Sequence, residues 1–156
     1  MIGSGTALAE ALDAADQRPA PDVAPGALVI AAVEYPAIEP ARWLDLIEEF
    51  GHQALDAVNR DAGVEGPLHA RVDAVNRCLF TDLGFHGNRD KYTDVRNSCL
   101  NQVLSRRTGI PITLSVVYMD VARRAGLKAE GVNFPGHFLV RVWDTATGNA
   151  AGGLVV

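Results

Sequence analysis

The segment that most constrains the fold runs from Pro111 to Gly126. Its apolar residues cover most of the circumference of a helix, instead of one stripe: Ile112, Leu114, Val116, Val117, Met119 and Val121. A helix that is apolar nearly all round must be covered on most of its sides. Pro111 suits a first helical turn, where its missing N–H has no partner to lose. The sequence therefore predicts a central helix buried by the rest of the chain.

After Gly126 the pattern changes from helical spacing to alternation. In the segment His137–Trp143, polar and aromatic positions alternate with Phe138, Val140 and Val142, which is the period of a strand. Turn-forming residues follow over 144–149. We predict strands over 127–134, 137–143 and 152–156, arranged as a meander.

Two amphipathic helices are predicted before the central one. The first begins at Pro40 and places Trp43, Ile47 and Phe50 on one face. The second runs from about Pro67 to near Gly84. Helices followed by a meander indicate an α+β fold with N-terminal helices packed on a small antiparallel sheet.

The domain boundaries follow from composition. Residues 1–25 are rich in Ala, Asp and Pro, and we expect them to be weakly ordered. Residues 26–156 are expected to form one domain with its own core. Because the chain stops on Leu154–Val156, in the middle of a predicted strand, we expect this domain to be truncated at its C-terminus.

A polar segment, Gly84–Arg96, separates the second helix from a third, which we expect to be capped by Asn97 or Ser98 and to end at Gly109. Long loops in compact domains are often functional. The candidate binding residues in and after this loop are Arg89, Tyr92, Arg96, Asn97 and Asn101. They could form a binding cleft, or they could hold the loop's own backbone, and the sequence leaves both interpretations open.

Composition excludes several classes of partner. The net charge is −5 with a pI near 5.3, so nucleic acid and anionic membranes are poor partners. No apolar stretch is long enough to span a bilayer, and no export signal is present, so a cytoplasmic location is expected. Cys78 and Cys99 are expected to be reduced and buried. No metal-ligand spacing and no nucleotide-binding glycine motif occurs, so neither a metal nor a cofactor is predicted.

Three motifs within Gly84–Val142, GNRD, RNSxLNxVLxRRxGIPIxLSVxY and GVxFPGHFLVR, resemble the bacterial SirB-type proteins of the transglutaminase-like superfamily. The resemblance implies a papain-like core in which a cysteine at the start of a buried helix faces a histidine and an aspartate. His137 matches the histidine. Pro111 occupies the position of the cysteine, and proline supplies neither a nucleophile nor an N–H.

Two functions remain open. The first is a regulatory module that binds a peptide or protein segment through the cleft and lacks the usual thiol. The second is an amidase- or peptidase-like hydrolase in which His137 acts on Ser115 or on a water molecule. Ser115 lies one helical turn after Pro111, whereas Cys99 and Thr113 are less suitably placed. The resemblance also implies an acidic partner beyond residue 156 and often a following tetratricopeptide repeat domain, a further possible partner.

Overall fold

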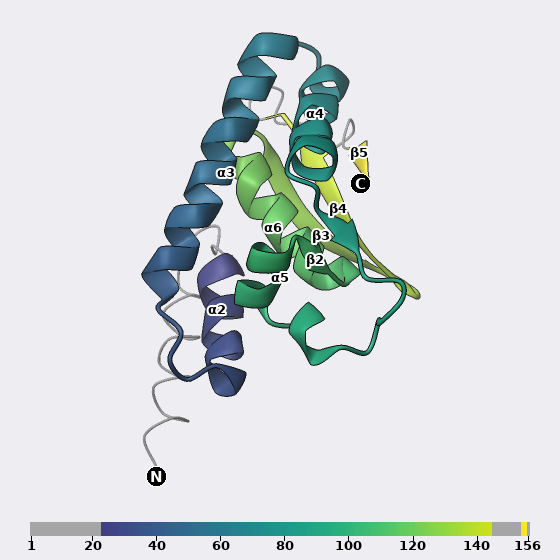
Figure 1. Ribbon diagram of the computed structural model, residues 1–156. Helices are drawn as coiled ribbons and strands as arrows, with labels where there is room; N and C mark the ends of the chain where they lie inside the picture. The colour runs from purple at the N-terminus through teal and green to yellow at the C-terminus, as the bar shows by residue number, and fades with distance from the viewer. Residues whose placement is uncertain (1–22, 145–153, 156) are drawn as a thin grey trace.

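The computed structural model describes residues 23–144 and 154–155, and it has the predicted α+β architecture (Figure 1). The helices are α2 (Val23–Glu34), α3 (Pro40–Asp61), α4 (Leu68–Asn76), α5 (Leu100–Arg106) and α6 (Pro111–Arg124). The strands are β1 (His86–Gly87), β2 (Thr108–Gly109), β3 (Lys128–Phe134), β4 (His137–Trp143) and β5 (Leu154–Val155). Two short helical segments complete the described chain: the π-helix η1 (Arg77–Asp82) and the 3-10 helix η2 (Val95–Asn97).

The predicted central helix is confirmed as α6. It contacts α3 on one side and β3 and β4 on the other, and its residues from Val116 to Ala122 are all buried. Gly51 permits a close approach of α3, because a Cβ there would lie 2.5 Å from the Cβ of Arg124. The apolar circumference of α6 is therefore explained by neighbours on several sides.

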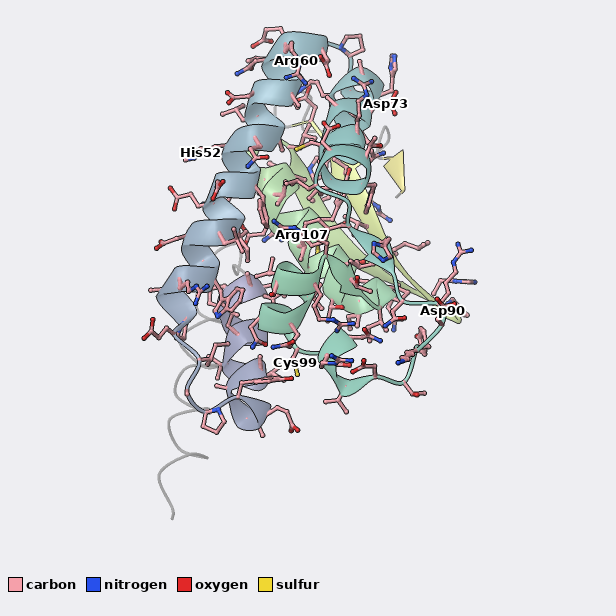
Figure 2. The ribbon with its side chains drawn as sticks, viewed as in Figure 1. His52, Arg60, Asp73, Asp90, Cys99 and Arg107 are labelled. Carbon is pink, nitrogen blue, oxygen red and sulfur yellow. The ribbon has the colours of Figure 1, made fainter. Side chains whose placement is uncertain are left out.

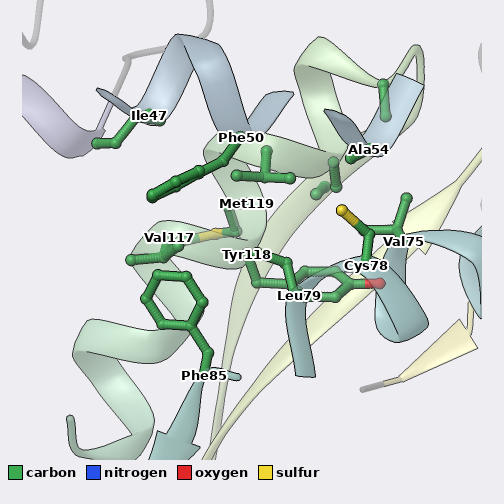
Figure 3. Close-up of a cluster of buried hydrophobic side chains, with 14 of the residues drawn as sticks. Ile47, Phe50, Ala54, Val75, Cys78, Leu79, Phe85, Val117, Tyr118 and Met119 are labelled. Atoms are coloured by element: carbon green, nitrogen blue, oxygen red, sulfur yellow. The ribbon is translucent and has the colours of Figure 1, made fainter. Parts of the chain in front are cut away.

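The main core lies between α3, α6 and the segment that follows α4 (Figure 3). The rings of Phe50 and Phe85 meet edge to face with centroids 5.8 Å apart. The guanidinium of Arg107 lies 4.2 Å from the Phe50 ring centroid and 5.2 Å from that of Phe85. Cys78 and Cys99 are free and buried, as predicted.

The larger sheet has the order β3-β4-β5, and its neighbouring strands are antiparallel. β3 and β4 are joined by Pro135-Gly136, where Gly136 has a φ of +77°, the left-handed region that glycine adopts without strain. Val140 and Val142 are buried and define the core face of β4. The register pairs Phe134 with His137, and the alternation of β4 places His137 on the face opposite Val140 and Val142, at the tip of the hairpin.

The third predicted helix has different boundaries from those expected. α5 begins at Leu100 instead of following an Asn97 or Ser98 cap, because Asn97 lies within η2 and uses its side chain to hold the preceding loop. The helix ends before Arg107, which has a φ of 56°, so Gly109 does not terminate it. Gly109 lies instead in β2, which pairs in parallel with β1.

At the N-terminal side, α2 begins at Val23, earlier than the expected domain start at residue 26. Pro25 does not prevent this, because it falls in the first helical turn, where backbone N–H groups have no intrahelical acceptor. Residues 1–22, on which the rest of the predicted weakly ordered segment falls, lie outside the described residues. So do residues 145–153 and 156, which include Gly152, the expected start of the last strand. Within the described residues, no helix combines the length and the hydropathy needed to cross a membrane.

Candidate functional site

A pocket of about 500 Å³ opens where the tip of the β3–β4 hairpin meets the start of α6. We call it the hairpin pocket, and its lining consists of Tyr92, Ile110, Pro111, Ile112, Asn133, Gly136, His137, Phe138 and Leu139. The fold thus brings together three positions that the sequence singled out separately: Tyr92 from the polar loop, Pro111 from the helix start and His137 from the strand. No lining residue carries a fixed charge.

The start of α6 is fixed by Thr113 together with Gly109. The Thr113 hydroxyl donates to the backbone oxygen of Asn97 at 2.7 Å and accepts from the Ile110 N–H at 3.2 Å. Gly109 leaves room for that hydroxyl, since a Cβ at position 109 would lie 2.8 Å from Thr113 Oγ1. Pro111 is consequently held at the first position of the helix, at the wall of the pocket.

His137 is exposed and follows directly on the Pro135-Gly136 turn. Among the described residues, no side chain or backbone group makes a hydrogen bond or ion pair with its ring. An imidazole used as a general base is normally oriented by a second polar group, usually a carboxylate. The described part of the chain therefore presents His137 as a ligand-accessible ring without an orienting acid.

Asp144, the nearest acidic residue after the His137 strand, has a different role. Its carboxylate lies 3.1 Å from the guanidinium of Arg71, a buried residue of α4 whose other amino group donates to the Gly126 oxygen at 3.0 Å. At about 3.3 Å per strand residue, Asp144 lies roughly 23 Å along the chain from His137. This ion pair links α4 to the far end of β4 and does not orient the histidine.

Ser115 is buried, and its hydroxyl donates to the backbone oxygen of Pro111 at 2.7 Å. This is the common back-bonding arrangement of a serine inside a helix. Ser115 is also outside the lining of the hairpin pocket. These contacts favour a structural role. Cys99 is buried as well, and burial raises the pKa of its thiol, which disfavours the reactive thiolate.

Asn97 is the centre of the loop's hydrogen bonds. Its completely buried side chain donates to the backbone oxygens of Lys91 at 2.8 Å and Tyr92 at 3.2 Å, and accepts from Asn88 at 3.1 Å. These bonds hold Tyr92 at the edge of the hairpin pocket. For Asn97, the structural interpretation of the polar loop is therefore the better supported one.

The remaining candidate binding residues do not lie in the hairpin pocket. Arg96 forms an ion pair with Asp94 at 2.6 Å, and its hydrogen bonds lower the Asp94 pKa to about 2. Arg89 is exposed. Asn101 is buried and lines a different pocket, beside the connection between α2 and α3. Of the five predicted binding residues, Tyr92 alone lines the hairpin pocket.

Several residues of the pocket lining were not predicted from the sequence. Asn133 and Phe138 face each other across the hairpin, and Ile110 and Ile112 flank Pro111. The signal available for Asn133 was a polar residue in an otherwise apolar alternation, two residues before Pro135. Ile112 is an apolar residue at the start of a buried helix and was therefore expected in the core, but it is 49% exposed. Among the described residues, no group of His, Cys, Asp and Glu side chains is arranged to hold a metal ion.

A buried helix whose first turn meets a histidine-bearing hairpin is the arrangement expected of a transglutaminase-like core. Residues 43–153 match the family described as the transglutaminase-like superfamily, and the chain belongs to this family. No solved structure matches the chain.

Named relatives fall into two groups. A UPF0162 protein of Xylella fastidiosa is 46% identical over 116 residues, which is 74% of this chain and 40% of the relative. A UPF0162 protein of Pseudomonas aeruginosa is 35% identical over 147 residues, covering 88% of this chain and 51% of the relative. F-box only protein 21 of Mus musculus is 49% identical over 77 residues, 49% of this chain and 12% of the relative. The chain thus spans about half or less of these proteins.

Proposed function

We propose that this domain is a regulatory module that binds a peptide segment in the hairpin pocket and does not cleave it. The observation that carries the proposal is that Pro111 forms part of the pocket wall. By its motif, Pro111 corresponds to the residue that is a cysteine in the superfamily. Proline has no nucleophilic atom and no N–H to stabilise an oxyanion. The pocket thus retains a place for a substrate-like segment but lacks the usual group that attacks it.

The lining indicates the chemistry of the bound segment. Ile110, Ile112 and Leu139 offer apolar surface, and Asn133 and Tyr92 offer hydrogen-bonding groups. A pocket that combines apolar walls with a few polar groups selects an apolar side chain and orients the chain that carries it. The best-fitting ligand is an extended, uncharged peptide segment with one apolar side chain inserted beside Pro111.

The alternative function, hydrolysis, needs a nucleophile that His137 can activate. Ser115 does not supply it, because its hydroxyl proton is directed to the Pro111 oxygen at 2.7 Å. A water molecule beside His137 would require an orienting group for the imidazole, and Asp144 is engaged with Arg71. Binding without turnover therefore accounts for the geometry with fewer additional groups.

The setting in the cell is part of the proposal. Two free, buried cysteines suit a reducing compartment, which supports a cytoplasmic location. The region shared with this chain is 40% of one bacterial relative and 51% of the other. We propose that the domain functions within a longer SirB-type protein, where a C-terminal repeat domain would be a further partner.

The proposal can be tested with pools of acetylated, amidated tetrapeptides that vary one apolar position. We expect Tyr92→Ala and His137→Ala to weaken binding of the selected peptides about tenfold, measured by calorimetry. Arg89→Ala is the matched control, because Arg89 is exposed in the same loop as Tyr92 but lies outside the pocket. Equal binding by all three variants and the wild type would remove the hairpin pocket from the proposed function.

A further inference from the structure

A second pocket, of about 560 Å³, lies beside the connection between α2 and α3. We call it the α2–α3 pocket, and it is lined by Glu34, Tyr35, Pro36, Ala37, Ile38, Glu39, Arg42, Trp43 and Asn101. It shares no lining residue with the hairpin pocket. Figure 1 shows the α2–α3 connection and the tip of the β3–β4 hairpin on opposite sides of α5. In the same view, Figure 2 labels Asp90 in the polar loop, on the side of the hairpin tip, and Cys99 closer to α2.

The pocket contains a buried acceptor without a donor. Asn101 is 4% exposed, and its side-chain oxygen has no hydrogen-bond partner among the described residues. Burying an amide oxygen without a partner costs about 1–3 kcal/mol. Such a group in the wall of a pocket is explained if a ligand that carries N–H donors supplies the missing bond.

The charges in the pocket indicate the sign of that ligand. Glu34 and Glu39 are exposed acidic residues in the lining, and within the described residues neither of their carboxylates has an ion-pair partner. Arg42 is the only cationic residue of the lining. Its guanidinium is not paired with either carboxylate but lies 5.3 Å from the ring centroid of Trp43. The pocket therefore has negative charge available for a positively charged ligand.

The position of Arg42 also shows what the Trp43 ring can accept. A guanidinium over an indole face is a cation–π contact, worth about 0.5–2 kcal/mol depending on its exposure. Arg42 is exposed, so its contact lies at the weak end of that range and can be displaced. A second guanidinium approaching from solvent would meet the same aromatic face and two carboxylates, with the Asn101 side chain in the pocket wall beside them.

We propose that the α2–α3 pocket binds an arginine side chain of a partner peptide, and that Arg42 occupies the Trp43 ring in the absence of that peptide. A guanidinium fits better than an ammonium, because it is planar, stacks on aromatic rings and carries five N–H donors in a fixed arrangement. Those donors can reach carboxylate and amide oxygens at the same time. The proposal is independent of the hairpin pocket and of the function proposed for it.

The test uses the fluorescence of Trp43 in the full chain. The protein has two tryptophans, so a Trp143→Phe background leaves Trp43 as the reporter. The probe is acetyl-Gly-Arg-Gly-amide, and the matched control peptide replaces arginine by citrulline, which has a similar shape but no charge. We expect saturable binding of the arginine peptide and binding about tenfold weaker for the citrulline peptide. Equal binding of the two peptides, or no saturable signal, would overturn the proposal.

Variants at exposed positions separate recognition from folding. Glu34→Gln and Glu39→Gln should each weaken binding of the arginine peptide about threefold at low salt. Glu65→Gln, an exposed carboxylate outside the pocket, should not change it. Arg42→Gln should strengthen binding, because it frees the Trp43 ring and removes a positive charge. Unchanged or weaker binding by Arg42→Gln contradicts the competition on which the proposal depends.

Discussion

Proline at position 111 is the single residue with the greatest consequence for what this site can do. It lies in the lining of the hairpin pocket, where the start of α6 meets the histidine-bearing hairpin. Because Pro111 forms part of the pocket wall, a different side chain at that position would change the chemistry that the pocket offers. This makes the role of position 111 testable by introducing a thiol there.

The variant Pro111→Cys is predicted to gain a reactive thiol. A helix N-terminus and a nearby imidazole both favour a thiolate, so the new thiol should have a pKa below its ordinary value of about 8.5. The alkylation rate with iodoacetamide, measured against pH by mass spectrometry, checks this prediction. The background is low, because Cys78 and Cys99 are buried and burial raises the pKa of both thiols.

His137→Ala in the same variant is the control for the contribution of the imidazole. The double variant should have a higher thiol pKa than Pro111→Cys alone. A thiol at position 111 that titrates like free cysteine in both variants would mean that neither the helix nor the histidine acts on that position.

Arg96 is predicted to control the titration of Asp94. The hydrogen bonds from Arg96 lower the Asp94 pKa to about 2, so the carboxylate keeps its charge to acidities at which ordinary aspartates are neutral. Because the pKa is lowered, the stabilisation of this turn is complete above the ordinary value of about 4 and is lost as the pH falls towards 2. In Arg96→Ala, the carboxyl ¹³C titration of Asp94 should move up towards the ordinary value. An unchanged midpoint near 2 would show that Arg96 is not the cause.

At the scale of elements, the sequence predicted what depends on local periodicity. The central helix was found from its apolar circumference, and the strand His137–Trp143 from its alternation, with both ends correct. The π-helical segment Arg77–Asp82 was not predicted, although the apolar stripe from Pro67 to Gly84 covers it. Helical spacing distinguishes a helix from a strand, but it does not distinguish the hydrogen-bond ladder of a π-helix from that of an α-helix.

Elements fixed by distant contacts were missed for a physical reason. β1 and β2 each contain two residues and pair across a separation that includes η2 and α5. Such short segments have no period of their own. Likewise, α5 ends where Arg107 adopts a left-handed backbone, and its side chain packs against the rings of Phe50 and Phe85. The residue at the C-terminal end of α5 is therefore an arginine held by tertiary contacts and not the glycine that the sequence suggested.

The link between α4 and the end of β4 predicts a large effect on stability. The Arg71 side chain is 5% exposed, and it contacts both Asp144 and the Gly126 oxygen. Arg71→Ala breaks both contacts, and breaking a buried ion pair by removing one partner costs about 3–5 kcal/mol. Because the Asp144 side chain is 21% exposed, we expect Arg71→Ala to lower the free energy of unfolding by about 2–3 kcal/mol.

Denaturant unfolding measures this difference, and Arg60→Ala is the matched control. The Arg60 side chain is 64% exposed and pairs with Asp61, so its loss should change the free energy of unfolding by less than about 1 kcal/mol. Equal effects of the two substitutions would contradict the structural role given to Arg71.

At the scale of the whole molecule, the polar positions that looked like one cluster in the sequence separate in space. Tyr92 lines the hairpin pocket, Asn101 lines the α2–α3 pocket, and Asn97 holds the loop between them. The sequence could not make this division, because it depends on how η2 and α5 turn the chain. His137 and Pro111 were found because their motifs resemble a known family. The places of Asn133 and Ile112 in the hairpin pocket could be recognised only from the fold.

The central claim is that the hairpin pocket binds a peptide and leaves it intact. The most direct measurement follows the ring signals of the four histidines by NMR during titration with the apolar tetrapeptide pools, and then analyses the recovered peptides by mass spectrometry. We predict that the His137 signals shift, that those of His52, His69 and His86 do not, and that the peptides are recovered uncleaved. Cleaved peptides, or a His137 ring that does not respond to any pool, would contradict the claim.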